Sequence, residues 1–192
     1  MVALINNDYF TNSLSLPNTD SGKPEGEVLT SLILTLQPTY LDDLFGVEMA
    51  EDFNTSIEDI ETEIDDVPQK YRDIVFGKTF TALSGEKLKW IGLSSHGLVA
   101  GQGTTNKVSP LANYVYFNYV SQVIKSVQSI GVVEPNFENG KLVSPHQTCV
   151  SVYNAMVKNH LILNELLLSD TTAYATYKPL NLDLFTYIPH VI

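Results

Sequence analysis

Residues 109–130 have the sequence SPLANYVYFNYVSQVIKSVQSI. Ser109 is a typical helix-capping residue, and the proline after it is tolerated in the first turn of a helix. Apolar side chains then recur at spacings of three and four, which predicts one long helix over Ser109–Ile130. These side chains are Tyr116, Phe117, Val120, Val123, Ile124 and Val127. Because its first half is aromatic on nearly every side, we expect burial on more than one face, within the subunit or between subunits.

A second long helix is predicted over Gln147–Leu168 by the same periodicity. Its apolar stripe consists of Cys149, Tyr153, Met156, Val157, His160, Leu161 and Leu167. Between the two long helices, Asn139-Gly140 lies between short apolar pairs, which is typical of a small hairpin. We expect the two long helices to form the core.

Shorter helices are predicted before these two. Glu25–Gln37 has helical spacing of its apolar residues, and Pro38 is expected to end that helix. Thr39 is then expected to cap a second helix, whose apolar stripe is Leu41, Leu44, Phe45, Met49 and Phe53.

A third short helix and a β-hairpin follow. Pro68 is expected to start a helix over Gln69–Phe76, and Gly77 to stop it. The hairpin is expected near residues 79–91, with a three-residue loop at Ser84-Gly85-Glu86. The expected cross-strand pairs are Ala82 with Leu88 and Phe80 with Trp90.

These patterns together predict a mainly α protein, a helical bundle of about four to five helices with a small β-hairpin and extended terminal arms. Residues 1–24 carry little periodicity and are interpreted as an extended N-terminal arm. Residues 25–170 are expected to form the helical domain, and residues 171–192 a C-terminal arm.

The C-terminal arm has the alternation of a strand with one buried face. The phase of the alternation slips at Phe185, which predicts a bulge or bend. An arm this apolar should dock, either on its own helices or on a neighbouring subunit. We favour the neighbour, because a terminal arm can add as a strand to an exposed edge. The predicted contact residues are Leu180, Leu182, Leu184, Phe185, Tyr187 and Ile188.

Composition narrows the classes of function. The chain has 192 residues, 44% of them hydrophobic, which is enough for a sizeable core. The formal net charge of -11, with only 11 basic residues, argues against a protein that wraps nucleic acid. No apolar run approaches the roughly 20 residues of a membrane span, and the start of the chain lacks the pattern of a signal peptide. A single cysteine, Cys149, excludes an intramolecular disulfide.

Acidic residues are concentrated between Glu48 and Asp66, where nine of the 22 carboxylates lie. We interpret this stretch as a solvated face or loop. A calcium loop counted from Asp59 has acids at alternating positions, but Ile64 replaces the required glycine and Lys70 replaces the final glutamate. The fit to a calcium loop therefore fails.

Catalytic and metal-binding patterns are also lacking. Cys149 and His160 share one helix face, but eleven residues of helix place them roughly 16 Å apart, too far to cooperate. All four histidines are therefore expected to pack in the core or at its rim. Gly92–Lys107 resembles a phosphate loop only superficially, because Asn106 replaces the third glycine, and a surface loop is expected. We predict no catalytic residue, no cofactor and no metal.

Four signatures occur in order along the chain. They are Tyr40-Leu41-Asp42-Asp43-Leu44-Phe45-Gly46, Pro68-Gln69-Lys70-Tyr71-Arg72-Asp73 with Gly77-Lys78, Lys89-Trp90-Ile91-Gly92-Leu93, and Tyr114 to Tyr119. In this order the chain resembles, over roughly residues 25–168, the small helical head–tail connector or neck ring proteins of tailed bacteriophages, including crAss-like and related podoviruses. Most of the matching residues have apolar or aromatic side chains suited to packing.

The resemblance implies a structural virion protein rather than an enzyme. Such a subunit would assemble with copies of itself into a ring, typically twelvefold, beneath the portal protein and beside other neck or tail proteins. DNA would pass through the lumen without specific binding, and no membrane would be involved. The expected locations are the neck of the virion and the host cytoplasm during assembly. Two alternatives remain, a monomeric acidic inhibitor of the DNA-mimic type and, less favoured, a small enzyme with dispersed catalytic residues.

Overall fold

The computed structural model describes residues 2–16, 24–58, 60, 64–94, 108–128 and 145–189. Within these ranges the chain forms five α-helices and a two-stranded antiparallel sheet. The elements are α1 (Pro24–Phe45), α2 (Val47–Ser56), α3 (Gln69–Phe76), β1 (Lys78–Thr81), β2 (Lys87–Trp90), α4 (Pro110–Gln128) and α5 (Pro145–Ser169). The predicted class, a mainly α bundle with a small hairpin, is confirmed. The predicted Asn139-Gly140 hairpin and most of the Gly92–Lys107 loop lie outside the described residues.

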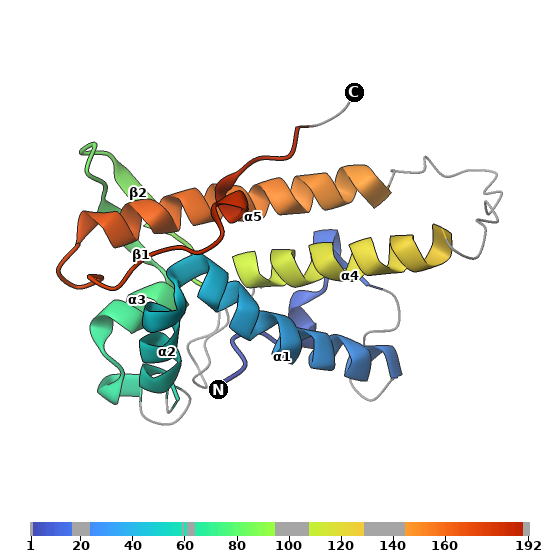
Figure 1. The fold of residues 1–192 in the computed structure, drawn as a ribbon, viewed down its shortest axis with the longest axis horizontal. Coiled ribbons are helices and arrows are strands. Elements are labelled where there is room, and N and C mark those ends of the chain that lie inside the picture. The colour runs from blue at the N-terminus through green and yellow to red at the C-terminus, as the bar shows by residue number, and fades with distance from the viewer. Residues whose placement is uncertain are drawn as a thin grey trace.

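The three long helices α1, α4 and α5 run across the molecule, with α4 between the other two in the view of Figure 1. The short helices α2 and α3 and the hairpin gather at one end. Tyr40 joins the three long helices in the core, since its ring centroid is 5.0 Å from that of Tyr114 on α4 and 5.6 Å from that of His160 on α5. The aromatic half of α4 thus packs within the subunit, which is one of the two arrangements expected from the sequence.

The first helix is longer than predicted, because Pro38 does not end it. Proline in a helix interior costs about 3 kcal/mol, since it removes one backbone hydrogen bond and crowds the preceding turn. Burial on both sides of Pro38 opposes that cost: Gln37, Tyr40 and Leu41 are all fully buried. The predicted helix start at Thr39 is therefore wrong, and tertiary packing carries α1 on to Phe45.

Helix α1 ends instead at Gly46, a residue that the sequence patterns did not single out as a helix boundary. Gly46 has a φ of +82°, a conformation that favours glycine, and α2 begins at the next residue. The apolar stripe expected over Leu41–Phe53 is buried as predicted, but it is divided between the two helices.

Other helix boundaries follow the sequence. Helix α3 spans Gln69–Phe76 between Pro68 and Gly77, as predicted. Ser109 caps α4 through its hydroxyl, which accepts from the amides of Leu111 (3.2 Å) and Ala112 (3.4 Å) and donates to the Leu93 carbonyl. Helix α5 starts at Pro145, two residues before the predicted start, and ends at Ser169.

The hairpin forms at the predicted place with a different register. Phe80 pairs with Leu88, and Lys78 pairs with Trp90, so the predicted pairs are wrong by two residues. The Ala82 amide donates to the Glu86 carbonyl (2.9 Å), which leaves residues 83–85 as the loop. Gly85 then takes the last loop position with a φ of +87°, where such loops need glycine. The expected shared face of Phe80, Ala82, Leu88 and Trp90 is unchanged, because a shift of two residues preserves the alternation.

The N-terminal residues 2–16 contain no α-helix or strand, only 3-10 turns at Asn7–Tyr9 and Asn12–Leu14. They nevertheless pack into the core through six buried side chains. These are Leu4, Ile5, Tyr9, Phe10, Leu14 and Leu16. The side chain of Gln37 on α1 fixes this segment, accepting from the Leu4 amide (2.9 Å) and donating to the Val2 carbonyl (2.7 Å).

Candidate functional site

The C-terminal segment, residues 178–188, carries the predicted contact residues and is held first by the end of α1. The chain turns back after α5 and runs beside α1 before crossing α5 (Figure 1). The amide of Lys178 donates to the Phe45 carbonyl (2.9 Å), and the amides of Leu180 and Asn181 donate to the Asp43 carbonyl (2.9 and 3.1 Å). The last carbonyls of a helix lack partners within the helix, so the segment caps the C-terminus of α1.

Side chains of α5 hold the rest of the segment by its main chain. The Tyr153 hydroxyl donates to the Asp183 carbonyl (2.8 Å). The Asn154 amide makes two hydrogen bonds to Ile188, donating to its carbonyl (2.8 Å) and accepting from its amide (2.9 Å). Together with His160, described next, these side chains form the α5 row, namely Tyr153, Asn154 and His160.

His160 joins the segment to two helices. Its Nδ1 lies 2.8 Å from the Leu184 carbonyl and its Nε2 lies 2.7 Å from the Tyr40 hydroxyl. Because a carbonyl only accepts, the proton belongs on Nδ1, and Nε2 accepts from Tyr40. Burial lowers the pKa of His160 to about 4, so the imidazole is neutral at pH 7. This histidine therefore serves the core, as expected, while the other three have side chains outside the described residues.

The predicted strand in the C-terminal arm is wrong. Leu182–Phe185 form a 3-10 turn, and the Asn181 side chain caps it by accepting from the Asp183 amide (3.0 Å). Asparagine side chains offer the backbone this local alternative to an extended strand, which the alternation of leucines does not reveal.

The six predicted contact residues are not equivalent in the structure. Leu184 is buried, Phe185 is partly buried against the core, and Ile188 is partly buried. Leu180, Leu182 and Tyr187 have exposed fractions of 58%, 69% and 50%. The segment therefore docks on its own subunit, and these three exposed side chains are the ones open to a neighbour.

Cys149 lies in the same helix as His160 but has a separate environment. Its side chain is buried, and burial raises the pKa of the thiol, which makes it a poor nucleophile. In the part of the chain that the structure describes, no three His, Cys, Asp or Glu side chains gather as metal ligands would.

The acidic stretch between Glu48 and Asp66 lies on the surface where it is described. Its six described carboxylates are exposed, as the interpretation of a solvated face requires: Glu48, Glu51, Asp52, Glu58, Asp65 and Asp66. Two of these residues contact α3. Asp52 accepts from the Tyr71 hydroxyl and lies 3.6 Å from Lys70 Nζ, and Asp65 lies 3.3 Å from Arg72. Lys70, which replaced the final calcium ligand in the sequence comparison, thus pairs with Asp52.

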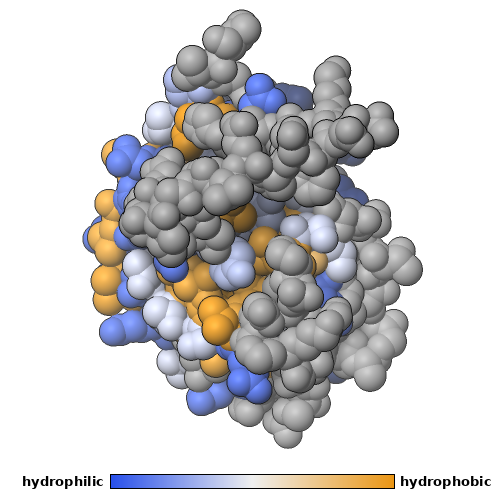
Figure 2. Space-filling view, turned by 90° about the vertical axis from the view of Figure 1, so that its right-hand side faces the viewer, coloured by the Kyte–Doolittle hydropathy of each residue, from blue (hydrophilic) through white to orange (hydrophobic). Residues whose placement is uncertain are grey.

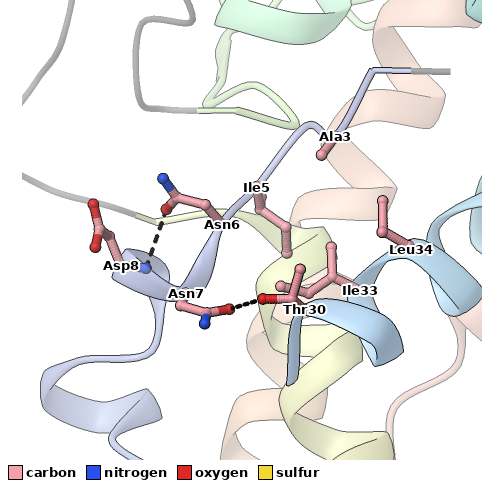
Figure 3. A pocket seen from close by; sticks show the side chains of 8 residues that line it. All are labelled: Ala3, Ile5, Asn6, Asn7, Asp8, Thr30, Ile33 and Leu34. Carbon is pink, nitrogen blue, oxygen red and sulfur yellow. Dashed lines mark hydrogen bonds between the residues drawn. The ribbon is translucent and has the colours of Figure 1, made fainter. Parts of the chain in front are cut away.

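A pocket of about 340 Å³ lies between the N-terminal segment and α1. Figure 3 shows its lining residues Ala3, Ile5, Asn6, Asn7, Asp8, Thr30, Ile33 and Leu34. Its asparagines are engaged within the protein. The Asn6 side chain accepts from the Asp8 amide (3.1 Å), and the Asn7 side chain accepts from the Thr30 hydroxyl (3.2 Å). The pocket thus has an apolar wall and a polar rim whose amide groups are largely committed to the fold.

Apolar surface is also visible at the end of the molecule where α1 and α5 begin and α4 ends. Figure 2 shows described apolar side chains gathered on this face, with described polar side chains beside them.

Comparison with known proteins gives no relative: no family model, curated protein or solved structure matches this chain. Among the described helices, none combines the length and apolar character needed to cross a membrane.

Proposed function

We propose that this chain is a structural virion protein, a ring-forming head–tail connector subunit that links the portal to the tail of a tailed bacteriophage. The observation that supports the proposal best is the meeting of the four signatures in one core. Tyr40 of the first signature packs on Tyr114 of the fourth at 5.0 Å. Trp90 of the third is fully buried, and its indole N–H donates to the Ile74 carbonyl of α3 (2.9 Å), the helix that carries the second.

The second and third signatures also meet through their backbones. A Cβ on Gly77 would lie 2.5 Å from the Trp90 carbonyl oxygen, and one on Gly92 would lie 2.5 Å from the Val75 carbonyl oxygen. Both positions therefore need glycine. The four signatures resemble the connector family in their order along the chain. In the folded chain they also pack together in one core, as expected if they belong to a common scaffold.

In the proposed ring, copies of this chain surround the DNA channel beneath the portal, in twelvefold symmetry by analogy with the connectors. The net charge of -11 suits a lumen along which DNA must slide without sticking. Neighbouring subunits, the portal and adjacent neck proteins would supply cover for the exposed apolar side chains Leu180, Leu182 and Tyr187. The protein would reside in the host cytoplasm before it enters the virion.

The proposal is tested by imaging and quantifying the protein in mature particles. We expect a closed ring in the neck and a copy number that fits it. A chain in which Leu180, Leu182 and Tyr187 are changed to serine should stay folded, because these side chains are exposed, but should enter particles poorly. The matched control is Leu83→Ser at the hairpin tip, where leucine is 73% exposed and substitution should leave incorporation unchanged. Absence from the particle, or a copy number that no ring allows, would reject the proposal.

A monomeric acidic inhibitor is the second candidate, favoured by the exposed carboxylates between Glu48 and Asp66. Such a protein imitates the phosphates of DNA and binds a basic partner. Solution mass together with salt-dependent binding separates the candidates. A chain that stays monomeric, is missing from particles and binds a basic partner less tightly as salt rises would be an inhibitor.

A further inference from the structure

The contact between Asn154 and Ile188 is unusual in its chemistry. One side-chain amide donates to the carbonyl and accepts from the amide of the same residue, with distances of 2.8 and 2.9 Å. A neighbouring antiparallel strand makes the same pair of hydrogen bonds. Asn154 therefore substitutes for a strand edge and binds the main chain of one residue whatever its side chain.

The rest of the α5 row contacts the segment in the same way. Tyr153 and His160 donate to the carbonyls of Asp183 and Leu184, both at 2.8 Å. The one deeply buried side chain among residues 182–188 is that of Leu184, with an exposed fraction of 4%. The row thus recognises a short peptide, which begins with a 3-10 turn, by its main chain and by a single leucine anchor.

We propose that the α5 row is a peptide-docking site that binds residues 183–188 of a second copy of this chain in exchange for its own. The segment already seated in the site defines the occupant that fits, because a second copy brings the same leucine and the same main-chain groups. Exchange of identical elements keeps every contact between the α5 row and residues 183–188, so its cost lies in association and in the connection that leads to the segment. The connection between Ser169 and Lys178 must take a new path, and half of residues 170–177 are exposed. The new path gives up the burial of Tyr174 and the hydrogen bonds of Tyr174 and Tyr177 to Lys70 and Asn164.

The exposed side chains fit this exchange. Leu182 and Tyr187 flank the anchor, and the structure leaves them 69% and 50% exposed. In an exchanged pair they lie at the junction of two copies, where a second surface can cover them. The idea that this exchange forms the subunit contact of a ring rests on the proposed function. The docking site itself can be tested on the free chain.

The test uses a full-length Leu184→Asp chain, because a carboxylate at this buried position is expelled at pH 7 and releases the segment from the row. The probe is a fluorescently labelled peptide of sequence PLNLDLFTYIP, residues 179–189, and its binding is followed by fluorescence anisotropy. We expect saturable binding to the Leu184→Asp chain. Binding to the wild-type chain should be at least about tenfold weaker, since its own segment competes.

Two further variants locate the binding. Adding Asn154→Leu to the Leu184→Asp chain should weaken peptide binding by about tenfold or more, because two hydrogen bonds are lost. The matched control is Asn159→Leu on the same helix, whose side chain donates only to the Ala155 carbonyl of its own helix (2.8 Å). This control should change affinity by less than about twofold.

Each remaining outcome decides the proposal. A folded Leu184→Asp chain that does not bind the peptide overturns it, as does binding that Asn154→Leu leaves unchanged. Equal binding of a peptide of reversed sequence shows a general peptide site and overturns the choice of a second copy as occupant.

Should Leu184→Asp fail to fold, the wild-type chain replaces it. Excess peptide must then speed hydrogen exchange of residues 183–188, and no change overturns the proposal. If the chain binds the peptide but forms no ring in the particle, the proposed function is rejected and this inference stands. If it forms rings but does not bind the peptide, this inference is rejected and the proposed function stands.

Discussion

Acidification should weaken the fold through His160. In the folded chain burial lowers the pKa of this imidazole to about 4, whereas its ordinary value is 6.5. Between these values the unfolded chain binds a proton that the folded chain does not, so stability falls as the pH drops from 6.5 towards 4. The difference between 6.5 and about 4, at about 1.4 kcal/mol for each pH unit, gives a loss of about 3 kcal/mol. The side chain is fully buried, so solvent does not reduce this figure.

The structural reason lies in the two contacts of the ring. Nδ1 donates to the Leu184 carbonyl and Nε2 accepts from Tyr40. A second proton on Nε2 therefore removes the acceptor and places a charge against the Tyr40 hydroxyl. The tyrosines around the ring stay neutral, since burial raises the pKa of Tyr40 and of Tyr114. The contact that should weaken first is that of Nε2 with the Tyr40 hydroxyl, because Nδ1 still donates to the Leu184 carbonyl after the ring is protonated.

The assay is urea unfolding from pH 7.5 to pH 4, followed by the emission of Trp90, which is the only tryptophan and is fully buried. The reference variant is His160→Gln, which can donate and accept but does not titrate in this range. Neighbouring carboxylates, including Asp43 and Asp183, are present in both chains, so their contribution cancels in the comparison. The free energy of unfolding of the wild type should fall by about 3 kcal/mol more than that of the variant. Parallel curves for the two chains would refute the reasoning.

Three more outcomes are expected. Gly46→Ala should destabilise the chain by more than about 2 kcal/mol and loosen the C-terminal segment, because its Cβ would lie 2.3 Å from the Lys178 carbonyl oxygen. Gly85→Ala is also at positive φ but has nothing within 4 Å, so it should cost only about 1 kcal/mol. Thermal unfolding measures both. Trp90→Phe should lower the free energy of unfolding by about 2 kcal/mol through the lost indole hydrogen bond and packing, measured by circular dichroism in urea. Cys149 should react with a thiol reagent only as fast as the chain unfolds, and immediate labelling of the native chain would contradict its burial.

Elements whose signals are local could be predicted from the amino-acid sequence. A cap at Ser109, a proline at position 68 and a glycine at position 77 act within one helical turn, and α3 and α4 begin or end there as predicted. The alternation of apolar residues likewise fixed which face of the hairpin is buried, although it left the register free to shift by two. In the same way, the spacing of Cys149 and His160 along one helix argued against joint chemistry, and their separate environments agree with it.

Features that depend on distant partners followed from tertiary packing. Pro38 is a strong local stop, yet the burial of Gln37, Tyr40 and Leu41 carries α1 past it. The α5 row binds main-chain atoms, which every residue has, so no pattern of side chains could reveal the site. Gly46 was a sequence signal for this docking. The position must lack a Cβ because of the Lys178 carbonyl, and Lys178 is 132 residues away in the chain. Local propensity is set by a few neighbouring residues, whereas the docking of the C-terminal segment is set by groups that meet only once the chain has folded.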